Sequence, residues 1–202
     1  MKTILLLILP FFLSAQDKFT TYQNSFGGKN VKDIRISLED KGKYTLYIEA
    51  IPMDKLFTDP GGINLSEKQN PEFIKALDQA KLKYDEWVKT AKDNNVTELR
   101  KDIDVKSISG AFFKTGSDWN FQFKVNLSFR FLILKSKDEV KYLLTINTGK
   151  LTSSSNQFTN VDGFSIIFSS DDEIEKFKEA ISITKINEFI AKPKEKDLFK
   201  DN

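Results

Sequence analysis

Residues 119–146 read WNFQFKVNLSFRFLILKSKDEVKYLLTI, and this stretch decides the fold. Its first half carries an apolar residue at every second position: Trp119, Phe121, Phe123, Val125, Leu127, Phe129, Phe131 and Ile133. Successive side chains of a strand point to opposite faces, so the pattern predicts one long strand with all eight on its core face. After a turn at 136–138 the same period resumes from Val140 to Ile146, which predicts a long antiparallel hairpin.

Shorter segments with the same alternation complete a predicted sheet. Residues 104–114 are expected to pair with the long strand across a turn at 115–118. Ile34, Ile36 and Leu38 alternate with polar residues, and 44–48 returns after a turn at 40–42. A loop is expected over 52–62, where prolines and glycines interrupt the pattern, and 164–168 is read as a last buried strand.

Two helical segments are predicted. Asn70-Pro71 reads as an N-cap followed by proline in the first turn, and an apolar stripe then runs at helical spacing to about Lys92. The second begins with Ser170 and Glu173, spaced as a capping box, and changes phase near Ser182. Strands segregated from helices predict an α+β domain over 31–191. We expect an antiparallel sheet of about six strands, a long inserted helix and a C-terminal helix. The sequence leaves open whether the sheet closes into a barrel.

The first residues have the composition of an export signal. Lys2 precedes an apolar run that ends in Ser14-Ala15-Gln16. A basic start, a short apolar segment and a small residue at the cut are typical of a secretory signal peptide. The sequence therefore predicts a signal peptide over 1–15, cleavage near Ala15, and a bacterial protein in the periplasm or outside the cell. A flexible leader is expected over 16–30, and a charged tail over 192–202.

Composition excludes several chemistries. The chain contains no cysteine and no histidine, which removes disulfides, Ser-His-Asp and Cys-His nucleophiles, and zinc or copper sites built on imidazole or thiolate. The formal net charge is only +2, and arginine occurs only at Arg35, Arg100 and Arg130. Nucleic-acid binding favours clustered basic residues and arginine forks, so no nucleic-acid partner is expected. No cofactor-binding motif is present, and no transmembrane span is expected in the mature chain.

Two groups of polar residues are candidate sites. Asp102 and Asp104 are weak metal candidates, since they fall on one side of a strand but lack the spaced oxygen ligands of a calcium loop. The polar positions of the long strand form a row that is expected to hydrogen-bond a ligand or partner: Asn120, Gln122, Lys124, Asn126, Ser128 and Arg130. A solvated sheet face is the alternative interpretation of this row.

Three functional hypotheses follow. The first is a non-catalytic exported domain that binds an unknown protein or small ligand through its sheet. The second is a hydrolytic enzyme that uses carboxylates or lysine. The third is an inhibitor or immunity-type partner protein.

Overall fold

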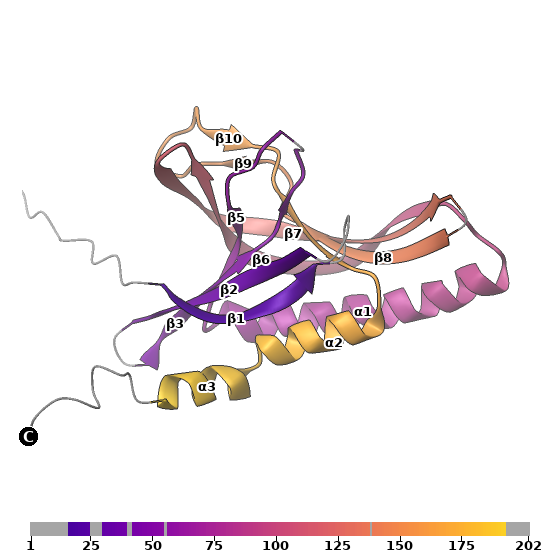
Figure 1. Ribbon diagram of the computed structural model, residues 1–202, viewed down its shortest axis with the longest axis horizontal. Coiled ribbons are helices and arrows are strands. Elements are labelled where there is room, and N and C mark those ends of the chain that lie inside the picture. The colour runs from indigo at the N-terminus through magenta and orange to yellow at the C-terminus, as the bar shows by residue number, and fades with distance from the viewer. Residues whose placement is uncertain (1–15, 25–29, 40–41, 55, 138, 193–202) are drawn as a thin grey trace, which may run out of the picture.

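The computed structural model describes residues 16–24, 30–39, 42–54, 56–137 and 139–192. The expected signal peptide and residues 193–202 of the expected tail lie outside the described residues. Within the described residues, three helices line one side of a sheet (Figure 1). The helices are α1 (Gln69–Asp93), α2 (Asp171–Ala180) and α3 (Ile183–Ala191). The strands are β1 (Asp17–Asn24), β2 (Asn30–Leu38), β3 (Tyr44–Glu49), β4 (Ile51–Pro52), β5 (Gly61–Ser66), β6 (Leu99–Thr115), β7 (Asp118–Ser136), β8 (Glu139–Asn147), β9 (Leu151–Thr152), β10 (Asn160–Val161) and β11 (Phe164–Phe168).

The α+β class with antiparallel strands is confirmed, but the expected number of about six strands is wrong, and the barrel-like closure that the sequence left open does not occur. Among the described residues, nine strands pair in the order β1-β2-β3-β5-β6-β7-β8-β11-β4, and β9 pairs with β10 apart from them. The sheet is not closed into a barrel. Only two residues of β4, which follows β3 after Ala50, pair with β11.

The expected flexible leader is wrong for residues 17–24, which form β1 on the edge of the sheet beside β2. Contacts of Tyr22 explain why this mostly polar segment forms a strand. Its ring packs 4.8 Å from that of Phe177, and its hydroxyl donates a hydrogen bond of 2.6 Å to the carbonyl of Glu49. One aromatic anchor with a satisfied hydroxyl offsets the entropy of ordering a mostly polar strand.

The hydrophobic core lies between the helices and one face of the sheet. Phe129, Phe131 and Ile133 of β7 are fully buried there, and Tyr84 of α1 packs edge-on against Phe131 at 5.8 Å. The predicted loop is shorter than expected, because residues 61–66 form the inner strand β5. The ring of Phe164 occupies the space that a Cβ on Gly61 would need, so a glycine in this strand is a packing requirement.

The helix boundaries agree with the predictions at α2 and differ at α1. Ser170 caps α2, and Glu173 reaches back to the amide of Ser169 at 2.7 Å, which confirms the capping signal. Asn70 is not a cap: it lies inside α1, is fully buried, and donates to the Ile181 carbonyl at 2.9 Å. Its amide therefore ties α1 to the end of α2.

Alkaline pH is expected to destabilise the protein through its buried tyrosines. Burial raises the pKa of Tyr84 from 10.0 to about 12, and nearby carboxylates, Asp85 first, add to the effect. A group with a raised folded-state pKa contributes stability that is complete below pH 10 and is lost as the pH rises through about 12. In Tyr84→Phe the free energy of unfolding should therefore fall less steeply with pH over this range. Urea unfolding at stepped pH measures this slope. Equal slopes in the two proteins would contradict this role of Tyr84.

Candidate binding surface on the outer face of the sheet

A β-bulge divides β7 into two parts. Val125 pairs with Ser109 of β6, whereas Gln122 pairs with Ala111. Between these two pairs β7 therefore contains one residue more than β6. Lys124 has a φ of +57°, the left-handed conformation found in many bulges. An extra residue exchanges the two faces of a strand beyond it. The row of alternating side chains predicted as continuous is therefore broken at Lys124.

The bulge reverses the orientation of the N-terminal part of β7. From Val125 to Ile133 the odd-numbered residues are buried against the helices, as predicted. Phe123 does not follow: its side chain is 69% exposed. Between the pairs Ser109–Val125 and Ala111–Gln122, Phe123 and Lys124 of β7 stand opposite the single residue Gly110 of β6. The expectation that Phe123 belongs to the core is wrong, and so is the same expectation for Trp119, which is 48% exposed, and for Phe121.

The predicted polar row is likewise split between the two faces. Asn120 is buried, and its amide donates to Thr115 Oγ1 at 2.8 Å. Gln122 is half-buried, and its Oε1 accepts a hydrogen bond of 2.6 Å from the amide of Thr152. Both residues hold the local fold together and are not available to a partner. Both residues were expected on the outer face, and the bulge that turns Phe123 outward also turns these two amide side chains inward.

The rest of the row stays on the outer face, over which none of the described helices lies. Lys124, Asn126 and Ser128 are exposed. Arg130 is half-buried and paired, because its Nε lies 2.5 Å from a carboxylate oxygen of Asp102. The structure thus brings together two residues that were predicted for different sites, as neighbours across β6 and β7.

This pairing weakens the metal hypothesis for Asp102 and Asp104. A guanidinium that holds one carboxylate competes with a cation for the same oxygens. Both aspartates lie on the exposed side of β6. Across the described part of the chain, no group of three or more acidic residues is placed to hold a metal ion.

Treatment with a chelator is accordingly expected to leave the melting temperature unchanged. A metal bound only by the native state would raise that temperature, and its removal would lower it. Thermal unfolding with and without chelator makes the comparison. A fall of several degrees would assign metal ligation to Asp102 and Asp104.

Aromatic side chains gather on the outer face beside the bulge. The Phe112 ring lies 5.5 Å from that of Tyr47 and 5.9 Å from that of Trp119, between centroids. The register places Phe121 directly opposite Phe112, and Phe123 follows at the bulge. We call these five residues the aromatic patch. Trp119 is 48% exposed, and Phe123 is more exposed still. Two large rings of the aromatic patch therefore face solvent.

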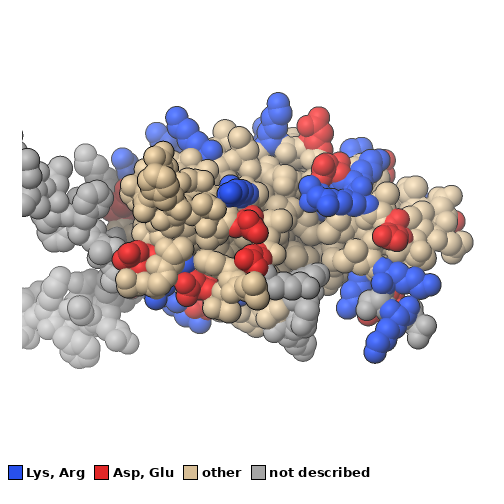
Figure 2. Space-filling view, turned by 90° about the horizontal axis from the view of Figure 1, so that it is seen from above, with Lys and Arg blue, Asp and Glu red and all other residues tan. Residues whose placement is uncertain are grey.

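Charge on this side of the molecule is mixed. Figure 2, which looks onto the side away from the helices of Figure 1, shows basic and acidic side chains interspersed over it. Some of them pair within the sheet: Arg35 Nε lies 3.5 Å from Glu49, beside the aromatic patch in the register of β2 and β3. A surface of balanced charge with exposed aromatic rings favours contact through apolar area and hydrogen bonds rather than through long-range attraction.

Two partly buried lysines with a shifted pKa, Lys81 and Lys178, are not arranged for catalysis. Burial acts to lower the pKa of Lys81, but the hydrogen bonds that its ammonium donates to Asp171 and Asp85 outweigh this effect, and the pKa is raised. The pKa of Lys178 is raised in the same way by Asp78 and Glu175, against the opposing effect of burial. A lysine base or nucleophile needs a lowered pKa. These two lysines instead join α1 to α2 by ion pairs.

Comparisons with models of protein families, with curated proteins and with solved structures find no match to this chain. Among the described residues, no helix is long and apolar enough to cross a membrane. The candidate site therefore rests on the geometry of the chain itself.

Proposed function

We propose that this chain is an exported bacterial protein that binds a partner protein non-catalytically through the aromatic patch and the polar residues that follow it on β7. The observation that carries the proposal is the bulge, which moves large aromatic side chains out of the core and onto the helix-free face. Interface hot spots are enriched in tryptophan and tyrosine, and exposed apolar patches mark interaction sites.

The neighbouring polar groups fit the rim of such an interface. Lys124, Asn126 and Ser128 are exposed and continue along β7 from Phe123. They offer hydrogen-bond donors and acceptors around an apolar centre, which is the usual anatomy of protein interfaces. The rival hypothesis of a lysine-based enzyme finds no support in the ion-paired Lys81 and Lys178.

The interface is tested by capture from an envelope extract of the source cells. Tagged protein is compared with Phe123→Ala and Trp119→Ala, and with Leu82→Ala as the matched control. Leu82 is 70% exposed on α1, so its loss removes exposed apolar area away from the patch. A partner retained by the parent and the control but lost from both patch variants is expected. Equal retention by all four proteins would rule out the aromatic patch.

Export is tested separately by the mass of the mature protein. We expect a chain that begins at Gln16, or within a residue or two of it, recovered from the periplasm or the medium. A cytoplasmic protein that retains Met1 would contradict the exported location and leave the capture experiment unaffected.

A further inference from the structure

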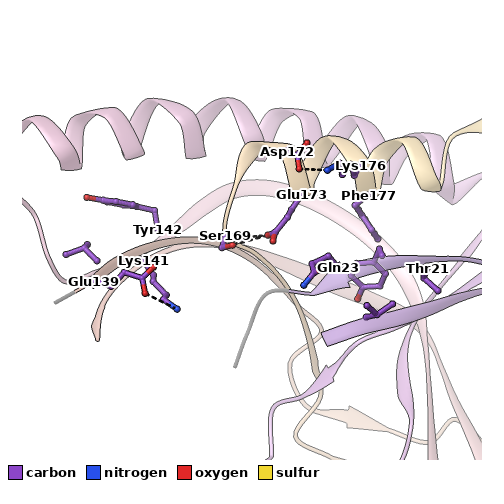
Figure 3. Close-up of a pocket in the computed structure, with 13 residues that line it drawn as sticks. Thr21, Gln23, Glu139, Lys141, Tyr142, Ser169, Asp172, Glu173, Lys176 and Phe177 are labelled. Atoms are coloured by element: carbon purple, nitrogen blue, oxygen red, sulfur yellow. Dashed lines mark hydrogen bonds and ion pairs between the residues drawn. The ribbon is translucent and has the colours of Figure 1, made fainter. Parts of the chain in front are cut away.

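A cleft of about 730 Å³ opens on the helix side of the molecule, between β1, β8 and the first turns of α2. Figure 3 shows Thr21 and Gln23 of β1 on one side of the cleft and Glu139, Lys141 and Tyr142 of β8 on the other. Above them, α2 contributes Phe177 and several charged side chains.

The lining shows that main chain, and not only side chains, borders the cleft. Residues 21–23 line one wall without a gap, and 139–142 line the other. Successive side chains of a strand point to opposite faces, so a cavity facing one sheet surface would meet every second residue. Contact with consecutive residues indicates that both strands turn their edges toward the cleft.

Both edges lack a strand partner within the described residues. β1 is the end strand of the sheet and pairs with β2 alone. β8 pairs with β7 along its whole length, but with β11 only over 144–147, which leaves 139–143 unpaired on the other side. Exposed strand edges are templates for the addition of another strand.

The charged groups of the cleft are largely paired with one another. Lys141 Nζ lies 3.4 Å from Glu139, and Lys176 Nζ lies 2.6 Å from Asp172. Glu173 holds the cap of α2 through Ser169. What remains for a ligand is the main chain of the two strands and the apolar surface of Val140 and Val31. The Tyr142 carbonyl is an exception, because it already accepts a hydrogen bond of 3.2 Å from the Tyr84 hydroxyl. Such a site selects an extended backbone rather than a charge.

We propose that the cleft accepts an extended peptide segment of a partner protein, which adds as a strand to the edges of β8 and β1. A residue within a sheet occupies roughly 160 Å³, from a rise of about 3.3 Å, a strand spacing of about 4.8 Å and a sheet spacing of about 10 Å. The cleft therefore holds about four to five residues. Main-chain hydrogen bonds supply affinity in this mode, and alternate side chains contact the pocket.

The test uses a panel of blocked heptapeptides whose alternate residues are Val, Leu, Phe or Thr, titrated into the mature protein and followed by amide NMR shifts. Binding should shift the amides of residues 21–23 and 139–142. N-methylation of alternate peptide amides removes donors along one edge and keeps the side chains, so it should weaken binding at least tenfold. The chain has no cysteine, so Gln23→Cys can be labelled with a bulky group. The label should block binding, whereas the same label at Leu82→Cys should not.

Three outcomes would overturn the proposal. Absence of binding across the whole panel would show that the edges are closed to a strand. Undiminished binding of both N-methylated forms, one for each edge of the peptide, would show that side chains and not main chain are recognised. Shifts confined to residues outside the cleft would place the peptide elsewhere. None of these outcomes depends on the aromatic patch.

Discussion

Phe129→Ala is expected to lower the free energy of unfolding by about 3–5 kcal/mol, whereas Phe123→Ala should change it by about 0.5 kcal/mol or less. The two residues have the same side chain and the same parity on one strand. Phe129 is 1% exposed, and the bulge at Lys124 places Phe123 in solvent. Urea unfolding of the two variants beside the parent measures the difference.

Two polar substitutions sharpen this comparison. Gln122→Ala should cost about 1 kcal/mol, because its Oε1 no longer accepts from the amide of Thr152. Ser128→Ala should stay within about 0.5 kcal/mol, as exposed positions do. A severe effect of Phe123→Ala together with a silent Gln122→Ala would mean that β7 runs without the bulge.

Gly163→Ala is expected to cost about 2–5 kcal/mol, against about 1–2 kcal/mol for Gly149→Ala. Both glycines have a positive φ, which penalises an alanine by about 1–2 kcal/mol. At Gly149 the new Cβ meets open space, but at Gly163 it collides with the main-chain oxygen of Gly149. Overpacking of this kind adds about 1–3 kcal/mol.

Thermal and urea unfolding of the two alanine variants provide the measurement. Gly163 immediately precedes β11, and its carbonyl accepts a hydrogen bond of 2.9 Å from the amide of Met53, so its displacement also strains the contact between β4 and β11. Equal losses at Gly163 and Gly149 would show that the two loops do not approach each other as described.

The elements with strong periodicity are those that sequence predicts well. The alternation from Val125 to Ile146 places the β7–β8 hairpin and its core face correctly. The stripe of α1 and the capping residues of α2 do the same for the helices, because each signal depends only on neighbours within a turn or two. Ser182, where the phase changes, is the cap between α2 and α3.

The residue types at the bulge do not reveal it in the sequence. A lysine in the left-handed conformation is not a preferred residue there, and no glycine or asparagine stands at the bulge itself. Length was the available signal: a strand of 19 residues spans about 63 Å, and a helix of 25 residues about 38 Å. One helix of that length cannot cover such a strand, so part of the alternation has to end outside the core.

Long-range contacts account for the other misses. Asn70 has the sequence context of a cap, yet its amide is used to bind the Ile181 carbonyl across 111 positions of chain. β1 is polar enough to be read as a leader, but Tyr22 finds Phe177 and Glu49 far along the sequence. Neither partner is visible in a local pattern.

The central claim is that the face exposed by the bulge is the surface that binds a partner. Hydroxyl-radical footprinting of the free protein and of the captured complex tests it most directly, residue by residue. We expect Trp119 and Phe123 to be oxidised readily in the free protein and protected in the complex, with Leu82 oxidised equally in both. Unchanged oxidation of Trp119 and Phe123 in a complex that protects other residues would contradict the claim.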